Sequence, residues 1–109
     1  MAYKACHRFA RIAPRKARLV ADLIRGHPID VAITALDFSK RRGAVFVRGV
    51  LKSAIANAQE KDADVARLFV SESRVDEGPT IKRFQPKDRG RSHAIMKRTS
   101  HIHVAVDVR

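Results

Sequence analysis

Lysine and arginine side chains crowd the stretch between residues 80 and 100. Each offers N–H donors that suit phosphate oxygens, and the planar guanidinium group of arginine can also stack on an unpaired base. A single acidic residue, Asp88, interrupts the stretch. This chemistry is that of polyanion binding rather than catalysis, and it predicts phosphate contacts for Lys82, Arg83, Lys87, Arg89, Arg91, Lys97 and Arg98.

Charge is segregated along the rest of the chain. Residues 4–25 carry seven basic residues and one acidic residue, and residues 40–52 carry five basic residues and none that is acidic. Residues 53–77 reverse the balance, with three basic residues against six acidic ones. The surface should therefore have basic faces and one nearly neutral face. In the first block we expect phosphate contacts from Arg8, Arg11, Arg15, Lys16, Arg18 and Arg25.

The overall charge favours nucleic acid as the partner. The 109 residues carry a formal net charge of +12, and a field of that sign attracts polyanions. Solubility alone explains the charge poorly, because a net charge of about 2–8 already keeps a small domain in solution.

Catalytic constellations are weak in this sequence. It contains no glycine-rich phosphate loop and no His-Glu-x-x-His pattern. The neighbouring carboxylates Asp76 and Glu77, and likewise Asp62 and Asp64, fit a turn and a solvated loop better than an acid–base pair. An RNase that uses His93 or His101 stays open as an alternative. We predict that the chain is not an enzyme and needs no cofactor.

Cys6 and two histidines are the only other reactive side chains that matter here. A single cysteine rules out an internal disulfide and suits a reducing compartment, and we interpret Cys6 as an ordinary thiol. His101 and His103 fall on one face of a strand, but a zinc site needs further ligands and the sequence offers no third. We therefore predict no metal site.

No segment of the sequence is suited to a membrane. The N-terminus is charged by Lys4 and has no apolar core of a secretory signal. No apolar run approaches the roughly 20 residues that span a bilayer. We expect a soluble intracellular protein without a membrane partner.

Helical periodicity governs the first half of the chain. Pro14 suits the first turn of a helix, and Ala13, Ala17, Val20 and Ile24, with Leu23 beside them, form one apolar face. Gly26 and Pro28 end this helix. A shorter helix follows from Ile29 to about Phe38, with Ser39 as the expected N-cap of a third helix. The apolar stripe of the third helix comprises Ala44, Val47, Val50, Leu51, Ala54, Ile55 and Ala58. Two glycines in it, Gly43 and Gly49, are interpreted as packing contacts.

Strand periodicity governs the two ends. Residues 3–12 read as extended, the run from Leu68 to Val75 as a strand, and Ile102, Val104, Val106 and Val108 as a half-buried strand. The chain is too short for two cores, so residues 1–109 should form one domain. The predicted fold is α+β, with three helices packed on a small antiparallel sheet.

A long β-hairpin is predicted between these strands, over residues 79–101 with its tip near Pro86–Gly90. Arms of about ten residues, at roughly 3.3 Å each, extend about 30 Å from the core. The segment has few apolar side chains, and a lone two-stranded ribbon is marginal in water. A disordered basic loop is the alternative. We favour an extended hairpin that becomes ordered when phosphates neutralise its charges. A disordered loop would not need Gly78-Pro79 before it, a turn at its tip and strands on both sides.

Several blocks in order resemble a known family. They are Arg15-Lys-Ala-Arg-Leu-Val-Ala-Asp-Leu-Ile-Arg-Gly26, Leu51-Lys-Ser-Ala-Ile-Ala-Asn-Ala58, Val75-Asp-Glu-Gly-Pro-Thr-Ile-Lys-Arg83 and Lys97-Arg-Thr-Ser-His-Ile102. Together they resemble bacterial-type large-subunit ribosomal protein twenty-two over nearly the whole chain. The resemblance implies a domain on the large subunit near the peptide exit and a hairpin threaded through 23S rRNA.

The resemblance also implies partners and sites. Partners would be 23S rRNA, other large-subunit proteins and the nascent polypeptide, in a cytoplasmic, ribosome-bound protein that forms no obligate homo-oligomer. Thr99 and His101 join the basic residues above as expected rRNA contacts. At the tip, Asp88 and Ser92-His93-Ala94 depart from the family pattern, which is basic or small there. The residues expected to line the exit tunnel are Ile81, Lys82, Arg83, Pro86, Lys87, Asp88, Arg89, Gly90 and Arg91.

A different class of binding protein is the main alternative. An architectural DNA-binding protein also uses basic β-arms, which it inserts into the minor groove, usually as a dimer. The apolar faces of the helices are all needed for the core, which leaves no obvious apolar dimer surface. We therefore place the DNA-binding alternative second.

Overall fold

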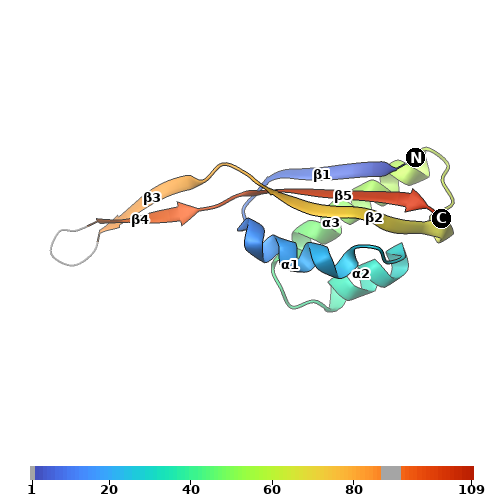
Figure 1. The fold of residues 1–109 in the computed structure, drawn as a ribbon, viewed down its shortest axis with the longest axis horizontal. Helices are drawn as coiled ribbons and strands as arrows, with labels where there is room; N and C mark the ends of the chain where they lie inside the picture. The colour runs from blue at the N-terminus through green and yellow to red at the C-terminus, as the bar shows by residue number, and fades with distance from the viewer. Residues whose placement is uncertain (1, 87–91) are drawn as a thin grey trace.

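A computed structural model describes the backbone of residues 2–86 and 92–109 and the side chains of residues 2–83 and 96–109. The elements within these ranges follow one another in a simple order (Figure 1). They are β1 (Tyr3–Ala10), α1 (Pro14–Ile24), α2 (Ile29–Phe38), α3 (Gly43–Glu60), the 3₁₀ helix η1 (Val65–Arg67), β2 (Leu68–Glu77), β3 (Ile81–Pro86), β4 (Ser92–Lys97) and β5 (Ser100–Val108).

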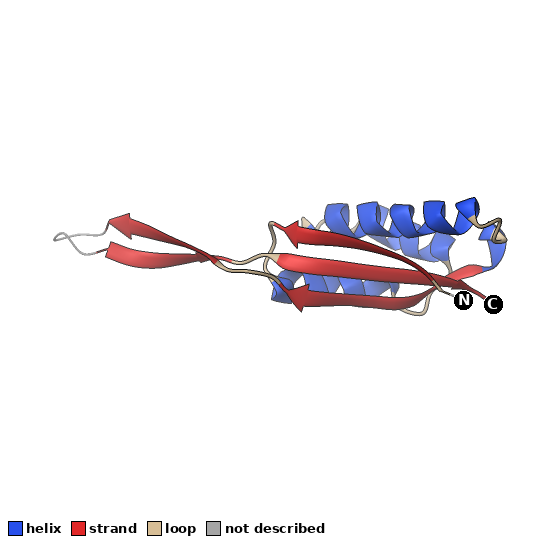
Figure 2. Ribbon diagram, turned by 90° about the horizontal axis from the view of Figure 1, so that it is seen from above, coloured by secondary structure: helices blue, strands red, loops and turns tan. Residues whose placement is uncertain are grey.

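Three strands form an antiparallel sheet in the order β1-β5-β2. The last strand in the chain is thus the central one, and its Ile102, Val104 and Val106 are fully buried or nearly so. The three helices cover one face of this sheet and leave the other uncovered (Figure 2). The predicted α+β fold, with three helices on an antiparallel sheet, is confirmed.

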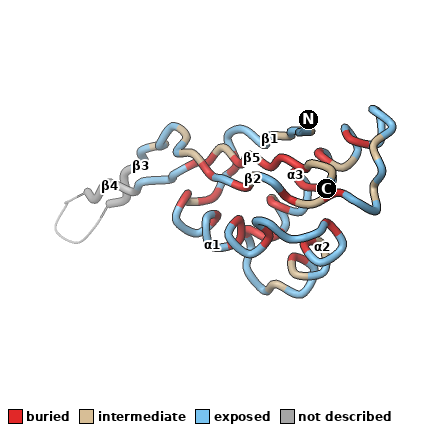
Figure 3. Tube along the Cα trace, turned by 45° about the vertical axis from the view of Figure 1, so that its right-hand side comes forward, coloured by how far each residue is buried: buried red, intermediate tan, exposed pale blue. Residues whose placement is uncertain are grey.

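The core lies between the helices and the covered face of the sheet (Figure 3). α1 buries Ala17, Val20 and Ile24, as its periodicity predicted, and Gly26 follows it with a φ of 82°. Leu23 was wrongly grouped with this face. It is 45% exposed, because it falls beside the stripe rather than within it.

The start of α3 also differs from the prediction. Ser39 is the C-cap of α2, and α3 begins four residues later at Gly43, with Arg42 at its N-cap and no side-chain cap. The Ser39 hydroxyl accepts a hydrogen bond from the backbone N–H of Arg41 at 3.3 Å. It therefore stabilises the connecting turn, and the prediction of Ser39 as the N-cap of α3 was wrong.

β3 and β4 form a separate two-stranded antiparallel sheet, which extends away from the helices (Figures 1 and 2). Its register runs from Ile81 opposite Lys97 to Pro86 opposite Ser92. At the junction with the main sheet, the backbone N–H of Gly78 donates to the carbonyl of Thr99 at 2.9 Å. The Thr99 hydroxyl donates to the carbonyl of Pro79 at 2.6 Å.

Substitution of alanine for glycine should have opposite effects on stability at two positions. A Cβ at Gly78 would lie 2.5 Å from Thr99 Oγ1 and 3.2 Å from its backbone carbon, so Gly78→Ala should destabilise the fold by about 1–3 kcal/mol. A Cβ at Gly49, an exposed position on α3, would meet nothing within 4 Å. Gly49→Ala should therefore stabilise the protein by about 0.5–1 kcal/mol through helix propensity.

Urea unfolding of both variants measures the two shifts. Equal shifts of the midpoint in the same direction would contradict the close approach at Gly78. The interpretation of both helical glycines as packing contacts holds for Gly43 alone, since only there would a Cβ meet buried neighbours.

Candidate nucleic-acid interface

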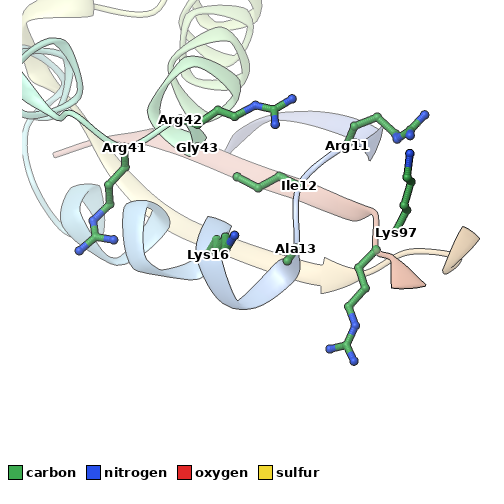
Figure 4. Close-up of a pocket in the computed structure, with 9 residues that line it drawn as sticks. Arg11, Ile12, Ala13, Lys16, Arg41, Arg42, Gly43 and Lys97 are labelled. Carbon is green, nitrogen blue, oxygen red and sulfur yellow. The ribbon is translucent and has the colours of Figure 1, made fainter. Parts of the chain in front are cut away.

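A basic hollow of about 550 Å³ opens at the junction between the helices and the β3–β4 ribbon. Three separate stretches of the chain line it, residues 11–16, 41–43 and 97–98, and none of the nine lining residues is acidic (Figure 4). Ile12 lies near its centre, with the long cationic side chains arranged around it (Figure 4). We call this feature the basic hollow, and its six cations are Arg11, Lys16, Arg41, Arg42, Lys97 and Arg98.

Packing beneath the basic hollow brings its segments together. A Cβ at Gly43 would lie 3.1 Å from Ile12 Cδ1 and 3.3 Å from Val20 Cγ2, so glycine lets the start of α3 approach this closely without displacing either side chain. On the other side, the buried hydroxyl of Ser100 donates to the carbonyl of Ile12 at 2.6 Å. This hydrogen bond ties the start of β5 to the segment between β1 and α1.

The six cations are not neutralised within the described part of the chain. None of them makes an ion pair with a described carboxylate, whereas Arg25, Arg48 and Arg74 each do. All six side chains are exposed. Cations gathered without carboxylates provide a site for an anion with several charges, and successive phosphates of a nucleic acid fit that description.

Arg41 and Arg42 were not among the predicted contact residues. They precede α3 in the turn after α2, and the helical pattern gave no reason to place that turn beside Arg11 or Lys97. The signal that could have found them is the acid-free block of five basic residues over 40–52.

Two predicted contacts, Arg18 and Arg25, are engaged with β2. Arg18 Nε donates to the carbonyl of Val75 at 3.2 Å, and Arg25 donates to the carbonyl of Ser73 at 2.5 Å. Arg25 also pairs with Asp22 at 2.8 Å. These bonds hold α1 against the sheet, so any phosphate contact from Arg18 or Arg25 has to share donors with them.

The other predicted contacts of the folded core lie at its surface, with one exception. Arg8 and Arg15 are exposed, whereas Thr99 is buried and its hydroxyl donates a hydrogen bond to the carbonyl of Pro79. His101 is half-buried, and its Nδ1 accepts a hydrogen bond from the backbone N–H of Phe9 at 3.1 Å. RNA contact by these four residues stays a prediction.

On the ribbon, the described side chains are mostly open to solvent. Lys82 and Arg83 are exposed and Ile81 is half-buried. A second, smaller hollow is lined by Glu77, Thr80, Lys82, Met96 and Arg98. The predictions that fall outside the described residues are those for Lys87, Asp88, Arg89, Gly90 and Arg91, together with those for the side chains of Pro86 and His93.

The uncovered face of the sheet differs from the basic hollow. There Arg74 lies between Asp76 and Glu72, and hydrogen bonds to these two carboxylates raise the pKa of its guanidinium above the usual value. Positive charge on this strand is thus balanced locally. The contrast identifies the junction, not the uncovered face, as the candidate surface for a polyanion.

Cys6 and His103 are brought together on that uncovered face. Cys6 Sγ lies 3.8 Å from His103 Nε2, and Asp76 Oδ2 lies 3.3 Å from the same nitrogen. A nucleophilic relay needs the carboxylate on the opposite ring nitrogen, so this arrangement does not activate the thiol. Within the described residues, no group of three or more His, Cys, Asp or Glu could hold a metal ion.

The chain matches a known protein family over most of its length. A family model described as ribosomal protein L22p/L17e matches residues 5–107 of the 109-residue chain. The match includes all three stretches that line the basic hollow and both strands of the ribbon. Among the described residues, no helix is long and apolar enough to cross a bilayer.

Proposed function

Because the chain belongs to the ribosomal protein L22p/L17e family, we propose that it binds 23S rRNA through the basic hollow and the β3–β4 ribbon. Members of this family are structural proteins of the large ribosomal subunit, not enzymes. The chain accordingly acts as a ribosome-bound structural constituent. Its partners are ribosomal RNA and neighbouring ribosomal proteins.

One observation carries this proposal. Six exposed cations from three stretches of the chain converge around Ile12 without a carboxylate among the lining residues. A general need for solubility does not require such convergence, since dispersed charge serves that purpose equally well. Phosphates of a folded RNA supply matching negative charge from several directions at once.

The ribbon extends the same interface. Its exposed Lys82 and Arg83 continue the positive charge away from the helices, and its backbone reaches beyond the folded core (Figure 1). We propose that rRNA encloses the ribbon, and that residues 81–83 and 86–91 line the path of the nascent polypeptide, as the family resemblance suggested. In this arrangement the protein also supports assembly of the subunit.

Sedimentation of ribosomes tests the proposal. A tagged copy expressed in cells should sediment with the large subunit on a sucrose gradient and stay there after a high-salt wash. Loosely held basic proteins are released by salt, because each phosphate contact adds to the salt dependence of binding. Release of the whole tagged population into light fractions would contradict a threaded ribbon and favour the DNA-binding alternative.

A further inference from the structure

Phe9 has an unusual backbone conformation at the base of the ribbon. Its φ is 58°, in the left-handed region that bulky residues rarely adopt. The residue lies in the irregularity between His7 and Ala10, where the pairing of β1 with β5 shifts register. Glycine would adopt the same φ without steric cost, so the bulge itself does not require a phenylalanine.

Burial does not account for the phenylalanine either. The residue is 55% exposed, whereas the neighbouring Ala10 is buried. An aromatic ring that is open to solvent contributes little stability through the hydrophobic effect, so its burial does not offset the strained backbone. Strained residues of this kind cluster at functional sites, where the surrounding structure holds them in place.

The ring of Phe9 is held from two sides. The backbone N–H of Phe9 donates to His101 Nδ1 at 3.1 Å, and the two rings meet edge to face with centroids 4.9 Å apart and planes at 84°. The guanidinium carbon of Arg8 lies 5.7 Å from the centroid of the Phe9 ring. The exposed ring is therefore fixed in orientation before any ligand arrives.

The neighbours of this cluster determine which ligand it suits. Arg11 follows Phe9 just after the end of β1, and Lys97 and Arg98 precede His101 at the end of β4 and in the link to β5. All three belong to the basic hollow. A ligand on the ring meets the guanidinium of Arg8, and cations of the basic hollow are the next ones along the chain, which favours a molecule with phosphates. A flat partner that carries phosphates and has a free face is a nucleotide whose base is outside a helix, because paired bases present only their edges.

We propose that Phe9, oriented by His101 and flanked by Arg8, is a stacking platform for one unpaired RNA base. The proposal rests on the proposed RNA-binding function and assigns a base contact to a surface that otherwise supplies only phosphate contacts. The guanidinium of Arg8 pairs with the phosphate of the stacked nucleotide. Stacking of this kind tolerates any base, since every base has a π face.

A tryptophan substitution reports on the contact directly. The chain has no tryptophan, so Phe9→Trp introduces a single indole whose fluorescence a stacked base quenches. We would titrate the full-length protein with a single-stranded uridine RNA and with an abasic oligoribonucleotide of the same length. Phe38→Trp is the matched control, because Phe38 is 84% exposed at the end of α2 and has no stacking partner within the described residues.

Only the uridine RNA should quench the Phe9→Trp protein, and neither RNA should quench the Phe38→Trp protein. Equal quenching by the abasic strand, or equal quenching of both variants, would overturn the platform. Failure of the unsubstituted protein to bind either strand at low salt would overturn the proposed RNA-binding function itself. The two failures are therefore distinguishable.

Affinity provides a second measurement. Phe9→Leu keeps an apolar side chain but loses the aromatic face, and Phe9→Gly removes the ring while relieving the positive φ. Both should bind uridine RNA roughly 5- to 150-fold more weakly, the range typical of losing one stacked base. Binding of the abasic strand should not change. If both variants fold normally and still bind uridine RNA with unaltered affinity, the proposal is contradicted.

Discussion

Replacing Arg11, Arg41 and Arg42 with glutamine should weaken the binding of 23S rRNA to the isolated protein by about 10- to 2000-fold. The estimate takes roughly 0.5–1.5 kcal/mol for each lost contact. Arg11 precedes α1 and the adjacent Arg41 and Arg42 precede α3, yet all three line the same basic hollow. The slope of log affinity against log salt should become shallower by about 2–3, because each phosphate contact contributes roughly 0.7–0.9. A filter-binding titration at several salt concentrations measures both quantities.

A control with the same change of charge separates a local site from a general field. Lys4, Lys52 and Lys61 are exposed and lie outside the basic hollow. Lys4 and Lys61 line a different hollow beside the N-terminus, which lies at the end of the molecule opposite the ribbon (Figure 1). Glutamine at these three positions should leave the salt slope nearly unchanged. Equal losses in the two triple variants would mean that net charge, not the basic hollow, drives binding.

Leu51→Ala should destabilise the fold by about 2–5 kcal/mol. Leu51 lies on α3 with no exposed surface, and it belongs to the core between the helices and the sheet. Alanine leaves a cavity that close-packed neighbours fill only in part. A loss of that size is a large fraction of the roughly 5–15 kcal/mol that stabilises a typical domain. Urea unfolding followed by circular dichroism measures it.

The same substitution on α1 is the control for this prediction. Leu19 is 49% exposed on the side of α1 that leaves the core, and Leu19→Ala should change the free energy of unfolding by less than about 0.5 kcal/mol. Leu19 and Leu23 also show that the apolar residues of α1 are not all used in the core. If both alanine variants lost equal stability, the assigned boundary between core and surface would be wrong.

Local sequence patterns were sufficient to predict most of the secondary structure. Pro14 at the first helical position and Gly26 after the last turn predicted the limits of α1, and the alternation of Ile102, Val104 and Val106 predicted β5. The first turn of α3 was mispredicted, because Ser39 is an equally good partner for a turn and for a helix N-terminus. A pattern of a few residues cannot separate those two uses.

The sequence by itself determined the fold class and the basic character of this protein. The periods of 3.6 and 2 residues specify which face of each element is apolar, and the excess of lysine and arginine specifies the sign of the field. Both properties are local or additive, so no knowledge of packing is needed. The family resemblance drew on the same linear order of residues.

Only the tertiary structure decided which cations share one site and which phenylalanine has a strained backbone. Arg41 and Arg42 reach Arg11 and Lys97 because Gly43 packs closely against Ile12 and Val20 and because Ser100 bonds to Ile12. The positive φ of Phe9 arises where β1 slips its register against β5, 92 residues further along the chain at His101. Such proximity depends on how whole elements pack against one another, and neighbouring residues in the sequence do not encode it.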